Sequence, residues 1–187
     1  FTTFDGQIPY FLAKIKFPKY HFEKISGSDL VFDLLHEASK KSYKVFLLGG
    51  QADSNEIAIK KIKSQYGINV DGYSPEKCNY PFPKDHNNEI LTKINSFKPD
   101  IIFVGFGAKK QEFWIYDNRK ILEEVGVKIA IGCGGSIEFI SGKLIRAPKI
   151  MQIAGLEGLW RLMIEPRFFR LKRLFKSLKI FYYFIKY

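Results

Sequence analysis

Residues 99–114 read PDIIFVGFGAKKQEFW, and the fold prediction starts from this stretch. The apolar run up to Val104 predicts a buried strand, and Gly105 and Gly107 follow where that strand must end. The next residues, KKQEFW, open a helical pattern. A tight glycine turn that leads into a helix beside lysines can hold a diphosphate, because free backbone N–H groups and the positive end of the helix dipole meet there. A nucleotide-dependent enzyme is therefore the first functional hypothesis.

Other apolar runs along the chain have the same character as this strand. None alternates polar and apolar residues as a strand wetted on one face would, which predicts a sheet covered on both sides. Helical patterns lie between the runs, and such alternation predicts βαβ units, a parallel sheet and the α/β class. The predicted strands are 44–50, 68–73, 100–107 and 127–135; the predicted helices are 26–41, 53–66, 87–97 and 109–125; residues 73–86, with three prolines, are predicted to form a loop or lid.

Glycines end three of the four predicted strands. Parallel strands share one direction, so these turns should meet at one edge of the sheet, where open α/β sheets bind ligands. The glycines of this predicted rim are Gly49, Gly50, Gly105, Gly107, Gly134 and Gly135. Glycine also simply permits tight turns, and the spacing does not match a G-x-G-x-x-G dinucleotide motif. Three turns together favour a nucleotide site.

Composition narrows the remaining classes of protein. With 187 residues and 46% hydrophobic content, the chain can form one substantial core. The two cysteines, Cys78 and Cys133, suggest neither a disulfide framework nor a metal centre, and no secretory leader is visible, so a cytosolic setting is expected. The sequence contains no run of about 18 uncharged apolar residues, so it does not predict a membrane-spanning helix.

The net charge of +11 is concentrated at the C-terminal end. Residues 161–187 carry eight basic side chains and one acidic side chain, a net charge of +7. Apolar residues recur there every three or four positions, which predicts a basic amphipathic helix on an anionic membrane surface. An ordinary C-terminal helix docked on the domain is the simpler alternative, and nucleic-acid binding is a third, without a recognised motif. We therefore expect a domain at 1–155 and a membrane-associating tail at 156–187.

Motifs distributed over nearly the whole chain resemble one family. They are FDG (4–6), SGSD (26–29), KVFLLGGQ (44–51), DGY (71–73), KPDIIFVGFGAKKQEFWI (98–115) and IAIGCGGSIEFISGKLIRAPKIMQIAGLEGLWRLMIEPRFFR (129–170). Together they resemble the bacterial WecG/TagA/CpsF glycosyltransferases, glycosyltransferase family 26. Members of that family have a further strand ahead of FDG. The resemblance therefore implies that this chain is N-terminally incomplete, with an exposed sheet edge.

The resemblance also implies an activity. The family transfers an N-acetylhexosamine-type sugar from a UDP donor, with inversion and without a metal ion or other cofactor. The donor is UDP-N-acetylmannosamine or its uronic acid, and the acceptor is a polyprenyl-diphosphate-linked sugar, commonly GlcNAc. The products serve teichoic acid, enterobacterial common antigen or capsule synthesis on the cytoplasmic leaflet. The implied fold is a Rossmann-like domain with a C-terminal appendage that reaches the membrane.

Residue roles follow from the family motifs, each beside a structural alternative. Asp5 matches the proposed general base, although Asp-Gly is commonly a turn. Lys24 stands where relatives carry arginine, and it keeps the charge but not bidentate phosphate recognition. Gln111 and Glu112 match polar residues that face the sugar nucleotide, or else only open a helix. Lys110 keeps a family lysine, whereas Lys109 replaces a proline.

The remaining candidate residues belong to the last glycine turn and to the tail. Gly134, Gly135 and Ser136 form a second anion-binding turn, and Glu138 either binds ribose or sugar hydroxyls or is a helix N-terminal charge. Arg161, Arg167 and Arg170 are expected to contact phosphate, unless they are solvated. The rival function is a non-catalytic α/β module that docks on anionic membrane or on a partner, and an uncovered edge also allows homo-oligomers.

Overall fold

The computed structural model describes residues 7–25, 27–164, 166 and 168–186. The chain divides into two compact units: Gly27–Ile145 forms one, and the N-terminal residues through Ser26 join Arg146–Tyr187 in the other. These bounds differ from the sequence-based division at residue 155, which also assigns functions to the two parts and stays a prediction.

The unit of residues 27–145 is built on a four-stranded parallel sheet with the strand order β2-β1-β3-β4. Its strands are β1 (Val45–Gly49), β2 (Val70–Tyr73), β3 (Ile101–Gly105) and β4 (Ile129–Gly132). The predicted parallel α/β fold is confirmed, and its architecture is Rossmann-like. The strands are shorter than the apolar runs that predicted them, because turns begin at the glycines.

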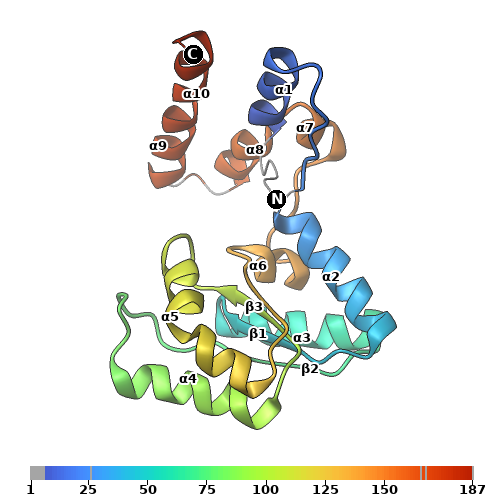
Figure 1. Cartoon of the computed structure of the whole chain (residues 1–187), viewed down its shortest axis with the longest axis vertical. Helices are drawn as coiled ribbons and strands as arrows, with labels where there is room; N and C mark the ends of the chain where they lie inside the picture. The colour runs from blue at the N-terminus through green and yellow to red at the C-terminus, as the bar shows by residue number, and fades with distance from the viewer. Residues whose placement is uncertain (1–6, 26, 165, 167, 187) are drawn as a thin grey trace. The chain divides into compact units, whose positions relative to one another are not determined.

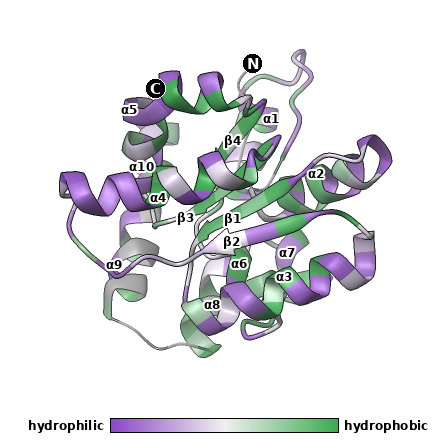
Figure 2. Ribbon diagram, turned by 90° about the horizontal axis from the view of Figure 1, so that it is seen from below, coloured by the Kyte–Doolittle hydropathy of each residue, from purple (hydrophilic) through white to green (hydrophobic). Residues whose placement is uncertain are grey.

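Helices cover both faces of this sheet (Figure 1). One face packs against α2 (Gly27–Lys41), α3 (Ala52–Tyr66) and α6 (Ser136–Ser141); the other packs against α4 (Lys84–Phe97) and α5 (Lys110–Val125). Alternate side chains of β1 pack into the two cores on opposite faces of the sheet. Leu47 packs on the side of α2, α3 and α6, whereas Phe46 and Leu48 pack on the side of α4 and α5. The hydrophobic colouring of β1 in Figure 2 reflects this two-sided burial.

The outer strands of the sheet are less protected than the central ones. All five residues of β1 are buried, whereas β2 and β4 are largely half-buried or exposed. Ile129 at the start of β4 is 36% exposed. Residues 74–83 between β2 and α4 contain no helix or strand, as predicted for that loop, although its last three predicted residues begin α4.

The second unit is helical in its described part. Its helices are α1 (Gln7–Lys16), α7 (Lys149–Ile153), α8 (Glu157–Ile164), α9 (Phe168–Ser177) and α10 (Lys179–Lys186). The predicted C-terminal helical appendage is thus present as three successive helices rather than one. The sequence did not lead us to expect α1. Among the described residues, no helix has the length and apolar character needed to cross a membrane.

Candidate functional site

Three turns meet at the carboxyl ends of β1, β3 and β4. Gly49 pairs with Gly105 in the sheet, and the N–H of Gly50 donates to the carbonyl of Gly105 over 3.3 Å. The N–H of Cys133 donates to the carbonyl of Val104 over 2.9 Å, which brings in the turn after β4. The strand order changes direction between β1 and β3, the usual place for a ligand in such sheets. The predicted convergence of the turns is therefore observed.

The glycines of this rim fall into two groups with different physical reasons. A Cβ at Gly49 would lie 3.0 Å from the carbonyl carbon of Gly105, and a Cβ at Gly105 would lie 2.9 Å from Ile137 Cδ1. These glycines let the turns pack against one another. Gly107 and Gly134 have φ of +89° and +54°, and a Cβ at either would meet no atom within 4 Å. Open space lies beside these two, where a ligand can approach the backbone.

Gln111 joins two of the turns. Its side chain is buried, and its Oε1 accepts a hydrogen bond of 3.1 Å from the N–H of Gly134. Its Nε2 donates to Glu112 Oε1 over 2.8 Å. A Cβ at Gly132 would lie 2.5 Å from this Nε2, so the glycine leaves room for the amide. Gln111 therefore holds the turn after β4 against the start of α5, while Glu112 is exposed.

The turn after β4 engages the other predicted side chains in different ways. Ser136 is buried, and its hydroxyl donates to the carbonyl of Cys133 over 2.8 Å, so this hydroxyl closes the turn. Glu138 Oε1 accepts from the N–H of Gln51 at 3.4 Å, which places a carboxylate beside the turn after β1. A Cβ at Gly135 would lie 3.7 Å from Glu138 Oε2. The predicted binding roles of these residues stay predictions.

Lys110 holds the loop between β2 and α4. Its ammonium group donates to the carbonyl of Cys78 over 2.8 Å. The hydroxyl of Tyr80 in the same loop bonds Asp117, and its ring stacks on Phe113. Burial, followed by the contact with Asp117, raises the pKa of Tyr80 to about 12, so the phenol stays protonated. Residues 74–83 are thus fastened to α5 at both its first turn and its second.

The backbone at Lys109 is strained. This residue precedes α5 with φ of 74° and ψ of −45°, a conformation that side chains with a Cβ rarely adopt. A proline ring fixes φ near −65°. A proline, which the resemblance implies at this position, therefore could not adopt this turn.

Two residues that support the rim were missed from the sequence. Asn55 is buried in α3, and its Nδ2 donates to the carbonyls of Leu47 and Gly49 over 3.0 and 2.8 Å. Ser74 Oγ donates to the same Gly49 carbonyl over 2.8 Å. The sequence did contain a signal for Asn55, because it is a polar residue on the otherwise apolar face of α3. No sequence signal pointed to Ser74.

A family model described as the Glycosyl transferase WecG/TagA/CpsF family matches residues 1–187. The chain belongs to this family. The suspected resemblance is confirmed.

Other residues that the WecG/TagA/CpsF motifs select belong to the helical unit or fall outside the described residues. Asp5 and Arg167 are outside the described residues, as are the side chains of Arg161 and Arg170. Lys24 belongs to the helical unit, where its Nζ donates to Gln7 Oε1 over 2.9 Å. In that unit Arg146 Nε lies 4.0 Å from Glu157 Oε1. The predicted roles of Asp5, Lys24 and the three tail arginines toward phosphate and acceptor stay predictions.

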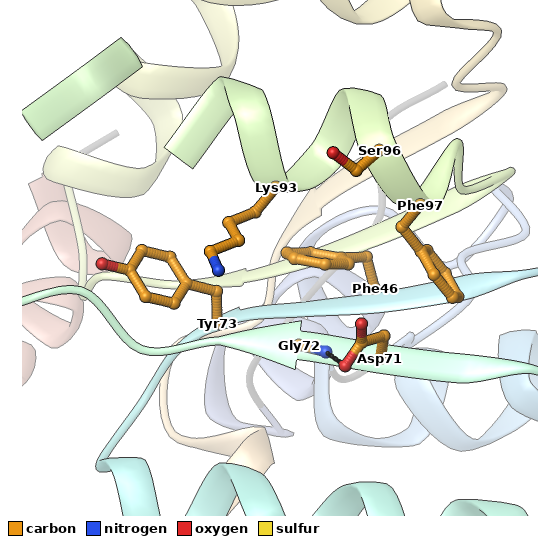
Figure 3. Close-up of a pocket in the computed structure, with 7 residues that line it drawn as sticks. All are labelled: Phe46, Asp71, Gly72, Tyr73, Lys93, Ser96 and Phe97. Atoms are coloured by element: carbon orange, nitrogen blue, oxygen red, sulfur yellow. Dashed lines mark hydrogen bonds between the residues drawn. The ribbon is translucent and has the colours of Figure 1, made fainter. Parts of the chain in front are cut away.

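A separate pocket of about 330 Å³ lies between β2 and α4 (Figure 3). Its lining is Phe46, Asp71, Gly72, Tyr73, Lys93, Ser96 and Phe97, none of which was predicted as a site residue. The side chain of Asp71 accepts from the N–H of Gly72 over 2.8 Å. Within the described part of the chain, no group of three His, Cys, Asp or Glu side chains is placed to hold a metal ion.

Proposed function

We propose that this member of the WecG/TagA/CpsF family moves an N-acetylhexosamine-type sugar from a UDP donor to a polyprenyl-diphosphate-linked GlcNAc. The observation that carries the proposal is the open space beside Gly107 and Gly134 in a chain of this family. There the backbone of two turns would face a ligand bound beside the switch point of the sheet. N-acetylmannosamine or its uronic acid is the donor sugar that the family resemblance favours.

The diphosphate of the donor would lie against the start of α5. The positive end of the helix dipole and the ammonium group of Lys110 attract an anion there. As UDP leaves, charge builds up on its diphosphate and must be neutralised. We assign this task to Lys110 and to Arg161, Arg167 and Arg170 of the tail, rather than to a metal ion or other cofactor. Glu138 would bind hydroxyl groups of the ribose or the sugar.

Asp5 is the general base of the proposed reaction. The acceptor hydroxyl attacks the anomeric carbon from the face opposite the diphosphate, and its proton passes to the Asp5 carboxylate. The new glycosidic bond forms while the bond from the anomeric carbon to the diphosphate oxygen breaks. The configuration at this carbon is inverted, and UDP is released.

The acceptor requires the enzyme to work at a lipid surface. Exposed apolar and basic residues of α9 and α10, among them Phe175, Lys176, Lys179 and Phe181, suit the headgroup region of an anionic bilayer. The enzyme would then lie on the inner leaflet of a bacterial membrane and make an early intermediate of teichoic acid, capsule or a related polysaccharide.

Radiolabelled transfer tests the proposal. We expect the chain to transfer label from UDP-N-acetylmannosamine or its uronic acid, but less from other UDP-sugars, to a polyprenyl-diphosphate-GlcNAc analogue. Asp5→Asn should lose most transfer while UDP still raises the thermal stability of the protein. Full transfer by Asp5→Asn would remove Asp5 as the base. Vesicle binding without any UDP binding would favour the rival reading, a non-catalytic membrane-docking module.

A further inference from the structure

Helix α1 presents an apolar stripe that its own unit leaves mostly uncovered. Ile8, Phe11, Leu12 and Ile15 follow the i, i+3, i+4, i+7 spacing of one helix face. No residue of α1 is buried. Phe11 is 47% exposed and Ile15 is 68% exposed. Amphipathic helices of water-soluble proteins bury such a stripe, so the stripe of α1 requires a partner surface.

The first turn of α1 packs against the turn between α7 and α8 in the helical unit. A Cβ at Gly155, in the turn between α7 and α8, would lie 3.1 Å from Ile8 Cγ1 and 3.3 Å from Gln7 Cβ. Gln7 also accepts the hydrogen bond from Lys24. At the other end of α1, the ammonium group of Lys16 lies 5.7 Å from the ring centre of Phe184 in α10. These contacts join α1 to the tail helices and leave the stripe beyond Ile8 largely uncovered.

The surroundings of the stripe are basic and aromatic. Residues 7–20 contain Lys14, Lys16 and Lys19 and no acidic residue. After the helix, Phe17 is 48% exposed and Tyr20 is 68% exposed. Lysines that flank an apolar stripe can extend toward lipid phosphates while their methylene groups stay in the apolar zone. Aromatic rings are favoured at the same depth.

We propose that α1 and residues 17–20 form a second membrane-contacting element that binds an anionic bilayer together with the C-terminal tail. Charge complementarity selects this occupant, because a second copy of the same surface would bring lysines against lysines. The sequence-based prediction placed membrane contact in residues 156–187 alone. The inference rests on the membrane association in the proposed function, but not on sugar transfer.

Vesicle sedimentation with the full chain tests the contribution of α1. The vesicles contain phosphatidylglycerol and phosphatidylcholine, or phosphatidylcholine alone. One lysine near an anionic surface strengthens binding roughly fivefold, so Lys14→Gln with Lys16→Gln should weaken binding to the anionic vesicles by at least that factor. The matched control is Lys60→Gln with Lys63→Gln, which removes the same charge from the exposed face of α3. We expect the control to bind within about twofold of wild type.

A second measurement reports contact directly. The tryptophan introduced by Phe11→Trp, in a Trp160→Phe background, should be quenched by lipids brominated on their acyl chains; Trp114, the other tryptophan, is fully buried. The tryptophan of Ile57→Trp on α3, also in that background, should not be quenched. If the wild type binds vesicles but the Lys14/Lys16 variant binds equally well and the Phe11→Trp variant is not quenched, the inference is wrong. If the wild type does not bind anionic vesicles, the membrane association of the proposed function fails as well, whereas radiolabelled transfer is judged separately.

Discussion

The side chain of Gln111 accepts a hydrogen bond of 3.1 Å from the backbone N–H of Gly134, 23 residues further along the chain. This bond connects two of the three turns that form the rim. The Nε2 group of the same buried amide donates a hydrogen bond to Glu112. A residue expected to face the sugar nucleotide therefore also sets the distance between the two turns that leave open space for it. Its loss should affect the shape of the site and the stability of the fold together.

Gln111→Ala should lower the free energy of unfolding by about 1–3 kcal/mol, because it leaves the N–H of Gly134 without this acceptor and removes a buried side chain. UDP binding should weaken in the same variant. Urea unfolding and titration calorimetry measure the two effects. Gln65→Ala, at an exposed position of α3, is the matched control and should change stability by less than about 0.5 kcal/mol. Equal stability of the two variants would contradict the role of Gln111.

Lys109→Gly should stabilise the protein by about 1 kcal/mol, because glycine adopts the φ of 74° without the strain that lysine bears. Lys109→Pro should destabilise it, since the ring cannot reach that angle. Urea unfolding measures both. Lys120→Gly, inside α5, is the control and should lose about 1 kcal/mol. A more stable proline variant would show that the turn keeps the form that proline allows.

Lys110 should exchange its partner when nucleotide binds. In the structure its ammonium group is bonded to the carbonyl of Cys78; in the proposed complex it faces the diphosphate. The reaction of Cys78 with a thiol reagent should then speed up when UDP is added, and Lys110→Met should abolish this dependence. Burial, and then the charge of Glu138, raises the pKa of Cys133 to about 12, so Cys133 contributes little to the signal. An unchanged rate at saturating UDP would contradict the exchange.

Because of Asp100, the free energy of unfolding should depend on pH in the acidic range. Partial burial opposes its ionisation, but hydrogen bonds from Lys128 and from the N–H of Lys44 hold its pKa below the ordinary value. The folded state therefore releases the proton more easily than the unfolded state. The resulting stability is fully present above the unfolded pKa of about 4 and is lost as the pH falls through the folded pKa.

Asp100→Asn should accordingly be less stable than wild type at pH 7, by about 1 kcal/mol. The difference should shrink below pH 4. Urea unfolding between pH 2.5 and pH 7 measures it. A difference that stays constant over this range would assign the effect to packing rather than to charge.

Much of the fold could be predicted because its signals are local. The apolar run before Gly105 and the helical pattern after Lys109 each lie within a few residues, and repetition of this pattern predicted the parallel sheet. The α1 helix also had a local signal, its apolar stripe at positions 8, 11, 12 and 15. It was missed although Pro9, in the first turn of the helix, is compatible with one.

The sequence alone thus determined the fold class and the three glycine turns, because propensity and periodicity act between neighbours. Its motifs carried the resemblance to the family. Tertiary structure alone decided that Gln111 accepts a hydrogen bond from Gly134 and that Lys110 donates one to the carbonyl of Cys78. It also decided that α1 packs with the tail helices. These contacts join segments far apart in the chain, and they depend on how the layers pack. No local pattern encodes which carbonyl a lysine reaches or which apolar stripe stays uncovered.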